Sequence, residues 1–123
     1  MEPSPLFIPA PVKPTVSLDT LEALDVRVGT ISRVEEVPGA ERLVRLTVEF
    51  GSCTRRIVAG IRKERADPTE VRGRQALFVV NVEPRKIHGE LSEGMLFDIG
   101  HADGIVPVLA IPERPVPDGV RAG

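Results

Sequence analysis

Residues 81–95 read NVEPRKIHGELSEGM, and this stretch decides how the rest of the chain is interpreted. An apolar segment, residues 76–82, precedes it, and a second, residues 95–99, begins at its end. Both segments have the pattern of buried strands, so we expect a polar loop between them that carries Arg85 and Lys86 after a rigid Pro84. A loop of this kind is a usual place for binding groups, although the pattern also fits an ordinary solvated connection.

Apolar alternation on both sides of this stretch predicts a small all-β domain. It is cleanest in residues 43–50, where every second side chain is apolar. Gly29 interrupts a long first strand, and a glycine there permits the sharp coil by which one strand serves both sheets of a small barrel. The expected strands are residues 25–37, 43–50, 54–61, 75–82 and 92–100, and in the last of them Met95, Phe97 and Ile99 are expected to point inward.

Two short helices are expected besides the strands. Proline at a first helical position predicts one helical turn from Pro68 to Val71, between the third and fourth strands. The other helix is expected over residues 17–24, where Asp19 and Glu22 have the spacing of a capping box.

The two ends of the chain differ from the middle in composition. Residues 1–16 are rich in proline and are expected to form an extended N-terminal extension, while residues 17–123 form the single domain. Residues 104–111 are a further apolar strand beyond the five that a barrel needs, and residues 112–123 are an extended tail. The apolar excess predicts a homodimer that is formed by the C-terminal strand and neighbouring N-terminal segments, because a two-fold interface buries the same patch twice.

The charge distribution leaves two interpretations open. The formal net charge is −2, which by itself argues against nucleic acid. Residues 25–75, however, contain eleven basic and eight acidic side chains, so a local positive face is able to attract phosphates. The same pattern also fits a solvated strand face. The basic residues are densest at Arg55, Arg56, Arg62, Lys63 and Arg65.

Composition gives little support to an enzyme or to a cofactor. Cys53, His88 and His101 do not have the spacing of a zinc site, and the chain contains no phosphate-binding glycine loop. With one cysteine, no leader pattern and no long apolar run, the chain is expected in the cytoplasm and not in a membrane. It has no Trp or Tyr, and its phenylalanines at 50, 78 and 97 fall on inward positions, so base stacking is not expected to be the main source of affinity for RNA.

Three separated motifs resemble one known family. The pattern Pro-Arg-Lys-Ile-x-Gly-x-x-Ser-Glu-Gly-Met in residues 84–95 is similar to the signature of the tRNA-binding OB-fold domain. Residues 24–31 and 56–63 resemble the same family, and the similarity covers residues 21–119. Its members include the C-terminal domain of many bacterial methionyl-tRNA synthetases, free-standing tRNA-binding proteins and the CsaA export chaperone. The resemblance implies a five-stranded OB-fold Greek-key barrel with short helices.

The resemblance also implies a set of binding residues. Arg85 and Lys86 are expected to contact phosphate, Asn81 to hydrogen-bond from the strand end, Ser92 to donate its hydroxyl, and Met95 to support the floor of the groove. Arg62 and Lys63 match the basic segment of the family at the same mouth of the barrel. With the charge pattern, the expected tRNA-binding residues are Asn81, Arg85, Lys86, Ser92, Met95, Arg62, Lys63, Arg55 and Arg56.

We therefore expect a non-catalytic protein that recognises folded tRNA and acts as a homodimer or as a module that aids an aminoacyl-tRNA synthetase. The alternative is a chaperone of the CsaA type that binds unfolded or pre-secretory polypeptides. A chaperone needs an exposed apolar patch, whereas a tRNA binder shows strong salt dependence, so the two functions are separable by experiment.

Overall fold

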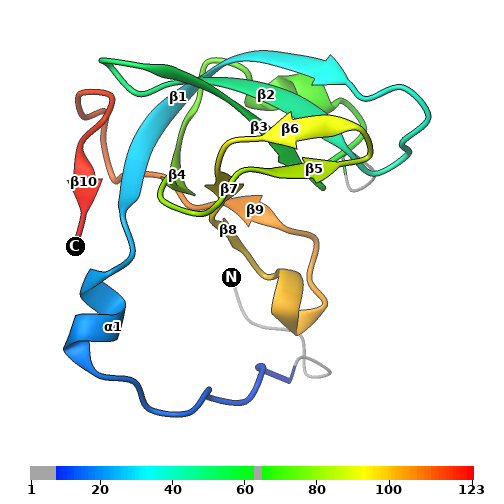
Figure 1. Ribbon diagram of the computed structural model, residues 1–123. Helices are drawn as coiled ribbons and strands as arrows, with labels where there is room; N and C mark the ends of the chain where they lie inside the picture. The colour runs from blue at the N-terminus through cyan, green and yellow to red at the C-terminus, as the bar shows by residue number, and fades with distance from the viewer. Residues whose placement is uncertain (1–7, 63–64) are drawn as a thin grey trace.

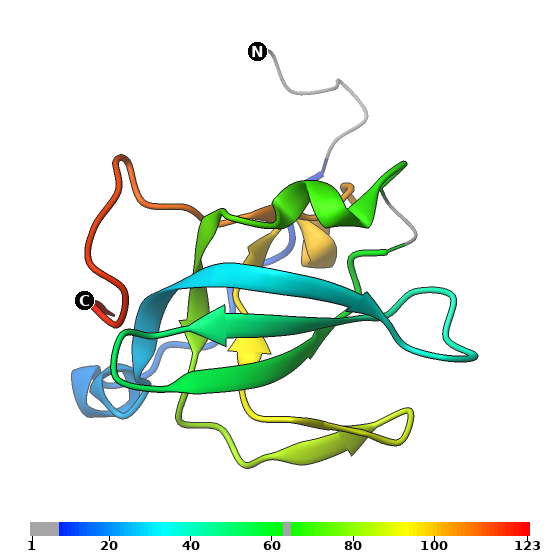
Figure 2. The ribbon, with the colours of Figure 1, turned by 90° about the horizontal axis from the view of Figure 1, so that it is seen from above.

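The computed structural model describes residues 8–62 and 65–123, which form a nearly closed antiparallel barrel (Figures 1 and 2). Its six-stranded sheet has the order β3-β2-β1-β4-β7, and β10 pairs with β1 in addition. The predicted all-β barrel of the OB-fold type is confirmed. The elements are α1 (Leu18–Glu22), β1 (Val26–Glu36), β2 (Val44–Glu49), β3 (Thr54–Ala59), η1 (Pro68–Val71), β4 (Gln75–Val79), β5 (Arg85–Ile87), β6 (Glu90–Ser92), β7 (Met95–Leu96), β8 (Asp98–Ile99), η2 (His101–Asp103), β9 (Val108–Leu109) and β10 (Arg121–Ala122).

The long strand β1 serves both halves of the barrel. Its first half pairs with β4 and its second half with β2, and the register shifts between Ile31 and Arg33. Gly29 lies where the strand changes partners. A Cβ at this position would stand 2.6 Å from Val48 Cγ1 and 2.7 Å from Phe50 Cε1, so no larger residue fits without movement of the core. The strand serves both halves of the barrel, as expected. The structure adds that close packing against Val48 and Phe50 requires glycine at this position.

The core is built from the inward faces of β1, β2, β3 and β4. In β2, Val44, Leu46 and Val48 are fully buried, as the alternation predicts. Phe50 and Phe78 meet edge to face, with ring centroids 5.6 Å apart. Each buried side chain of this size stabilises the fold by about 1.5 to 3 kcal/mol relative to exposure.

Both short helices lie at or near their predicted positions. The 3₁₀ helix η1 starts at Pro68 after an Asp67 cap and lies between β3 and β4. Helix α1 is capped by Ser17, whose Oγ accepts a hydrogen bond from Thr20 N at 3.2 Å. The predicted capping box starting at Asp19 is therefore wrong by two residues, since Asp19 lies inside the first turn.

The stretch that was predicted to be a polar loop is a β-hairpin. Strands β5 and β6 pair with each other and lie against β3 (Figure 2). The turn consists of His88 and Gly89, which both have positive φ, 50° and 80°. Two such residues make a turn of type I′, whose twist suits a two-residue hairpin. The sequence hides this turn because Asn or Asp, and not His, is the usual residue before the glycine.

The predicted orientation of the fifth strand is wrong by one residue. Leu96 is buried at 8% exposure, while Met95, Phe97 and Ile99 are 43 to 54% exposed. Leu96 stands directly opposite Phe78 in the antiparallel pair, and directly opposite residues share a face. Because the side-chain period is two, placing Leu96 inward turns its neighbours outward.

The C-terminal region differs from a free tail. Strand β9 is two residues long and pairs with β8, and Leu109 packs on the core. Further on, β10 pairs with the start of β1, so residues 112–123 return to the barrel instead of leaving it (Figure 1). Gly119 N donates to Val28 O at 2.8 Å, and Val28 N donates to Val120 O at 2.9 Å.

Within residues 8–62 and 65–123, no helix has both the length and the apolar content needed to cross a membrane.

Candidate functional site

The hairpin presents two cations to solvent. Arg85 and Lys86 lie on β5 and are both exposed. In the part of the chain that the structure describes, neither side chain makes an ion pair or a hydrogen bond. Their charges are therefore available to an anionic partner, as the resemblance implies.

An ion-pair network holds the hairpin on the barrel. Arg45 of β2 lies 3.0 Å from Glu90 of β6 and 3.2 Å from Glu35 of β1. The hydrogen bond from Arg45 lowers the pKa of Glu35, and the two carboxylates raise the pKa of Arg45. The charge of Arg45 is thus balanced by two carboxylates, and its pair with Glu90 ties the hairpin to β2.

A row of side chains crosses the face of β1, β2 and β3. Arg33 stands opposite Thr47, and Thr47 stands opposite Arg56, so all three share one face. Both arginines are exposed, and among the described residues neither side chain has an acidic partner within 4.0 Å. Arg56 was expected from the sequence, whereas Arg33 was missed. Only the strand register, which includes the shift after Ile31, reveals the position of Arg33.

Two loop tips meet at the same end of the barrel. The turn at residues 37–40 is closed by a hydrogen bond from Ala40 N to Val37 O at 3.1 Å. A Cβ on Gly39 of this turn would stand 3.3 Å from His88 Nε2, so the turn touches the hairpin tip. Arg62, which follows β3 in the chain, supports the turn, because its guanidinium donates to Ala40 O at 2.8 Å and to Glu36 Oε1 at 2.9 Å.

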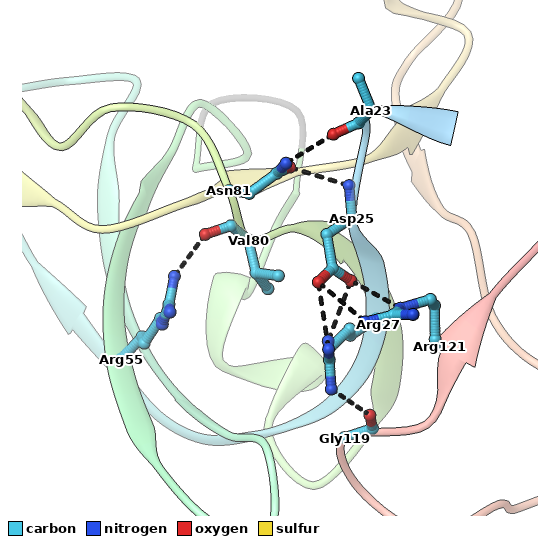
Figure 3. A network of polar contacts seen from close by, with 8 residues as sticks. All are labelled: Ala23, Asp25, Arg27, Arg55, Val80, Asn81, Gly119 and Arg121. Carbon is cyan, nitrogen blue, oxygen red and sulfur yellow. Dashed lines mark hydrogen bonds and ion pairs between the residues drawn. The ribbon is translucent and has the colours of Figure 1, made fainter. Parts of the chain in front are cut away.

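Three of the expected binding residues, Asn81, Arg55 and Arg62, use their side chains in internal hydrogen bonds, although Asn81 is exposed. Asn81 Nδ2 donates to Ala23 O at 2.7 Å, and Asn81 Oδ1 accepts from Asp25 N at 2.8 Å (Figure 3). The guanidinium of Arg55 donates to the carbonyl oxygens of Val80 and Glu93. Arg62 braces the turn as described above. Asn81 and Arg55 hold the backbone at the start of β1 and the end of β4, whereas Arg62 holds the turn beside the hairpin tip.

Asp25, just before β1, links the start of β1 to the C-terminal strand β10 (Figure 3). Its carboxylate accepts from Arg27 at 2.9 Å and from Arg121 at 3.3 Å. These contacts, first of all the hydrogen bond from Arg27, lower the pKa of Asp25. The network ties β10 to β1 at the end of the barrel away from the hairpin tip.

Ser92 and Met95 have different surroundings. Ser92 is 2% exposed, and its Oγ accepts from Val58 N and donates to Gly94 O, both at 3.0 Å. Its hydroxyl is already used, so we assign it to positioning. Met95 borders a groove beneath the hairpin, where its side chain is available. Lys63 lies outside the described residues.

In residues 8–62 and 65–123, no three His, Cys, Asp or Glu side chains are grouped so as to hold an ion.

Of the phenylalanines in the described part of the chain, Phe50 and Phe78 are buried and Phe97 is 46% exposed. The expectation that all three are in the core is therefore wrong for Phe97.

Comparison with protein families gives a match over most of the chain. Residues 26–121 match the family described as "Putative tRNA binding domain". The methionine–tRNA ligase of Chlorobium chlorochromatii is 44% identical over 92 residues, and that of Nitrosomonas europaea is 37% identical over 112 residues. The matches cover 75% and 91% of this chain but 13% and 16% of those enzymes.

Solved structures agree with this match. The methionyl-tRNA synthetase-related protein of Pyrococcus horikoshii superposes with a TM-score of 0.82 at 32% identity, over 90% of this chain and all of that one. The chaperone CsaA of Bacillus anthracis superposes with a TM-score of 0.76 at 27% identity, over 89% of this chain and all of that one.

Proposed function

The chain belongs to the tRNA-binding domain family, and from this premise we propose that it grips folded tRNA through its phosphates and catalyses no reaction itself. One observation carries the proposal. Four cations that form no direct ion pair among the described residues, Arg33, Arg56, Arg85 and Lys86, lie on the β1–β3 face and on the hairpin beside it. Cations held on rigid strands contact phosphates without reading the base sequence.

The proposal implies shape-selective binding. Each phosphate contact releases counterions, so affinity for tRNA should fall by about 0.7 to 0.9 log units per log unit of salt for each contact. Folded tRNA should bind better than unstructured RNA of equal length. Equal binding of the two RNAs, or an affinity that does not change between low and moderate salt, would contradict the proposal.

A single variant tests the face of the barrel. Arg56→Ala removes one of the four cations, so the salt slope should become shallower by about 0.7 to 0.9. The matched control is Arg114→Ala, because Arg114 is exposed but pairs with Glu113 at 2.9 Å in the C-terminal segment. Filter binding at several salt concentrations measures both variants. Equal slopes for the two would move the phosphate contacts away from this face.

We also propose that the chain works as a homodimer. Leu18, Leu21 and Leu24 of the α1 region are 50 to 74% exposed. A second apolar set on and near β8 and β9 is 46 to 56% exposed, and Figure 1 shows the elements α1, β8 and β9 below the barrel. The members of this second set are Phe97, Ile99, Ile105, Val106, Val108 and Ile111. Pairing with a second copy removes these side chains from water and gives two basic faces for one large RNA.

Sedimentation equilibrium tests the dimer. Leu21→Glu should give a mass near the 13.3 kDa of one chain, because a charge cannot be buried in an apolar interface. Leu91→Glu is the matched control, since Leu91 is equally an exposed leucine but lies on the hairpin. A wild-type protein that is monomeric at micromolar concentration would rule the dimer out.

The CsaA-like chaperone function is the second candidate, and the same exposed apolar surface favours it. Unfolded polypeptide would then compete with dimer formation, whereas a tRNA-binding dimer would leave an aggregating client protein unprotected. Light scattering of a denatured client distinguishes the two. An aminoacyl-tRNA synthetase is a further proposed partner, and the cytoplasm, where tRNA is used, is the proposed location.

A further inference from the structure

A groove of about 350 Å³ lies beneath the hairpin, between β5 and the segment of β7, β8 and η2. Its floor and walls include the apolar side chains of Leu43, Ile87 and Met95. Its volume lies within the range of ligand sites that combine apolar walls with a few polar groups.

Three polar side chains border the same groove. They are Arg85 of β5, Asp98 of β8 and His101 of η2. Among the described residues none of the three makes a side-chain hydrogen bond or ion pair. Asp98 is half-buried, so its carboxylate is held at an apolar wall without a partner. The carboxylate can therefore accept hydrogen bonds from a molecule that enters the groove.

These features select the chemistry of the ligand. A bare phosphate is disfavoured, because the Asp98 carboxylate would repel it. A wholly apolar ligand would leave the carboxylate and the guanidinium unpaired. The ligand must therefore offer both an apolar surface and hydrogen-bond donors. A nucleobase offers both, since its faces pack on apolar side chains and on the Met95 thioether while its edge donates hydrogen bonds.

We propose that this groove receives one unpaired base of the bound RNA and that Asp98 prefers guanine. The inference rests on the proposed function, since Arg85 at the rim then holds the phosphate attached to that base. Guanine presents two adjacent donors, N1–H and N2–H, which match the two oxygens of a carboxylate. Uracil presents only N3–H on that edge, and cytosine and adenine present an amino group beside an acceptor that the carboxylate does not favour.

Methyl NMR of the full chain tests the inference with mononucleotides as probes. GMP should shift the Met95 methyl signal and bind more tightly than UMP by about 5- to 150-fold, as expected for one well-aligned pair of hydrogen bonds. Asp98→Asn should remove this preference, because an amide presents one acceptor and one donor in place of two acceptors. Asp19→Asn, on the exposed helix α1, is the matched control and should keep the preference.

The outcomes separate this inference from the proposed function. The guanine site alone would be overturned if tRNA binding is salt-dependent but GMP and UMP shift the Met95 signal equally. It would also be overturned if tRNA binds in this way but millimolar GMP causes no shift. A failure to bind tRNA would overturn the proposed function, while the mononucleotide titration would still report on the groove. A preference for GMP that survives in Asp98→Asn would also refute the assignment of Asp98.

Discussion

Ser92 lies in the signature stretch, and the structure predicts that its replacement damages the fold before it affects a ligand. In Ser92→Ala the amide of Val58 loses its acceptor, and the carbonyl of Gly94 loses a donor. Ser92 is 2% exposed and Val58 is 7% exposed, so water cannot easily replace the hydroxyl. A buried backbone donor left without a partner costs about 1 to 3 kcal/mol.

Thermal unfolding followed by circular dichroism measures this loss. For a domain of 123 residues each kcal/mol lowers Tm by roughly 4 °C, so a decrease of about 4 to 12 °C is expected. Ser52→Ala is the matched control, because Ser52 is exposed in the turn between β2 and β3 and its hydroxyl makes no hydrogen bond among the described residues. That variant should stay within about 0.5 kcal/mol of the wild type.

The result that would refute the reasoning is a Ser92→Ala variant as stable as Ser52→Ala. If it also lost affinity for tRNA, Ser92 would be a contact residue, as the resemblance implies, and the hydrogen bond to Val58 N would be dispensable. Loss of stability with unchanged affinity of the folded fraction would support the positioning role.

Three further predictions concern the barrel itself. Gly29→Ala should lower the free energy of unfolding by about 1 to 3 kcal/mol in urea titration, because the new methyl overlaps buried Val48; a neutral effect would show that the core yields there. The lowered pKa of Asp25 means that its contact with Arg27 adds stability above the ordinary carboxyl pKa and that this stability is lost as pH falls through the lowered value. Asp25→Asn should therefore show a weaker decline in stability as the pH is lowered through the acidic range; parallel curves would contradict this. His88→Asn should raise stability by up to about 1 kcal/mol, since Asn tolerates the left-handed φ of 50° better; a lower Tm would assign His88 a contact that compensates its backbone.

The barrel could be predicted from the sequence because its strands alternate or form apolar runs between strong turn signals. Residues 43–50 illustrate this, since every apolar side chain there is buried or half-buried as expected. The inward face of the fifth strand was predicted wrongly, because this strand is only a few residues long and is apolar at successive positions. With Met95, Leu96 and Phe97 in a row, periodicity cannot choose which one faces inward, and only the pairing with Phe78 decides it.

The candidate site could be predicted in part. The motif fixes Arg85 and Lys86 as neighbours, and both are exposed, but the hairpin of β5 and β6 that carries them was predicted as a loop. Side-chain contacts could not be foreseen, because hydrogen bonds such as that of Asn81 to Ala23 join residues 58 positions apart. Arg33 was missed since a bulge shifts its register, and a bulge leaves no regular pattern in a single sequence.

The pairing of β10 with the start of β1 brings the two ends of the barrel domain together. Val26 and Ala122 are cross-strand partners, so the chain enters and leaves the barrel side by side. Figures 1 and 2 place the C-terminal end, with β10, on the side of the barrel opposite to the β1–β2 turn and the hairpin tip. Adjacent ends make a domain easy to append, insert or circularly permute. A host protein joined through those ends would leave the β1–β3 face and the hairpin, which carry the cations, accessible to a ligand.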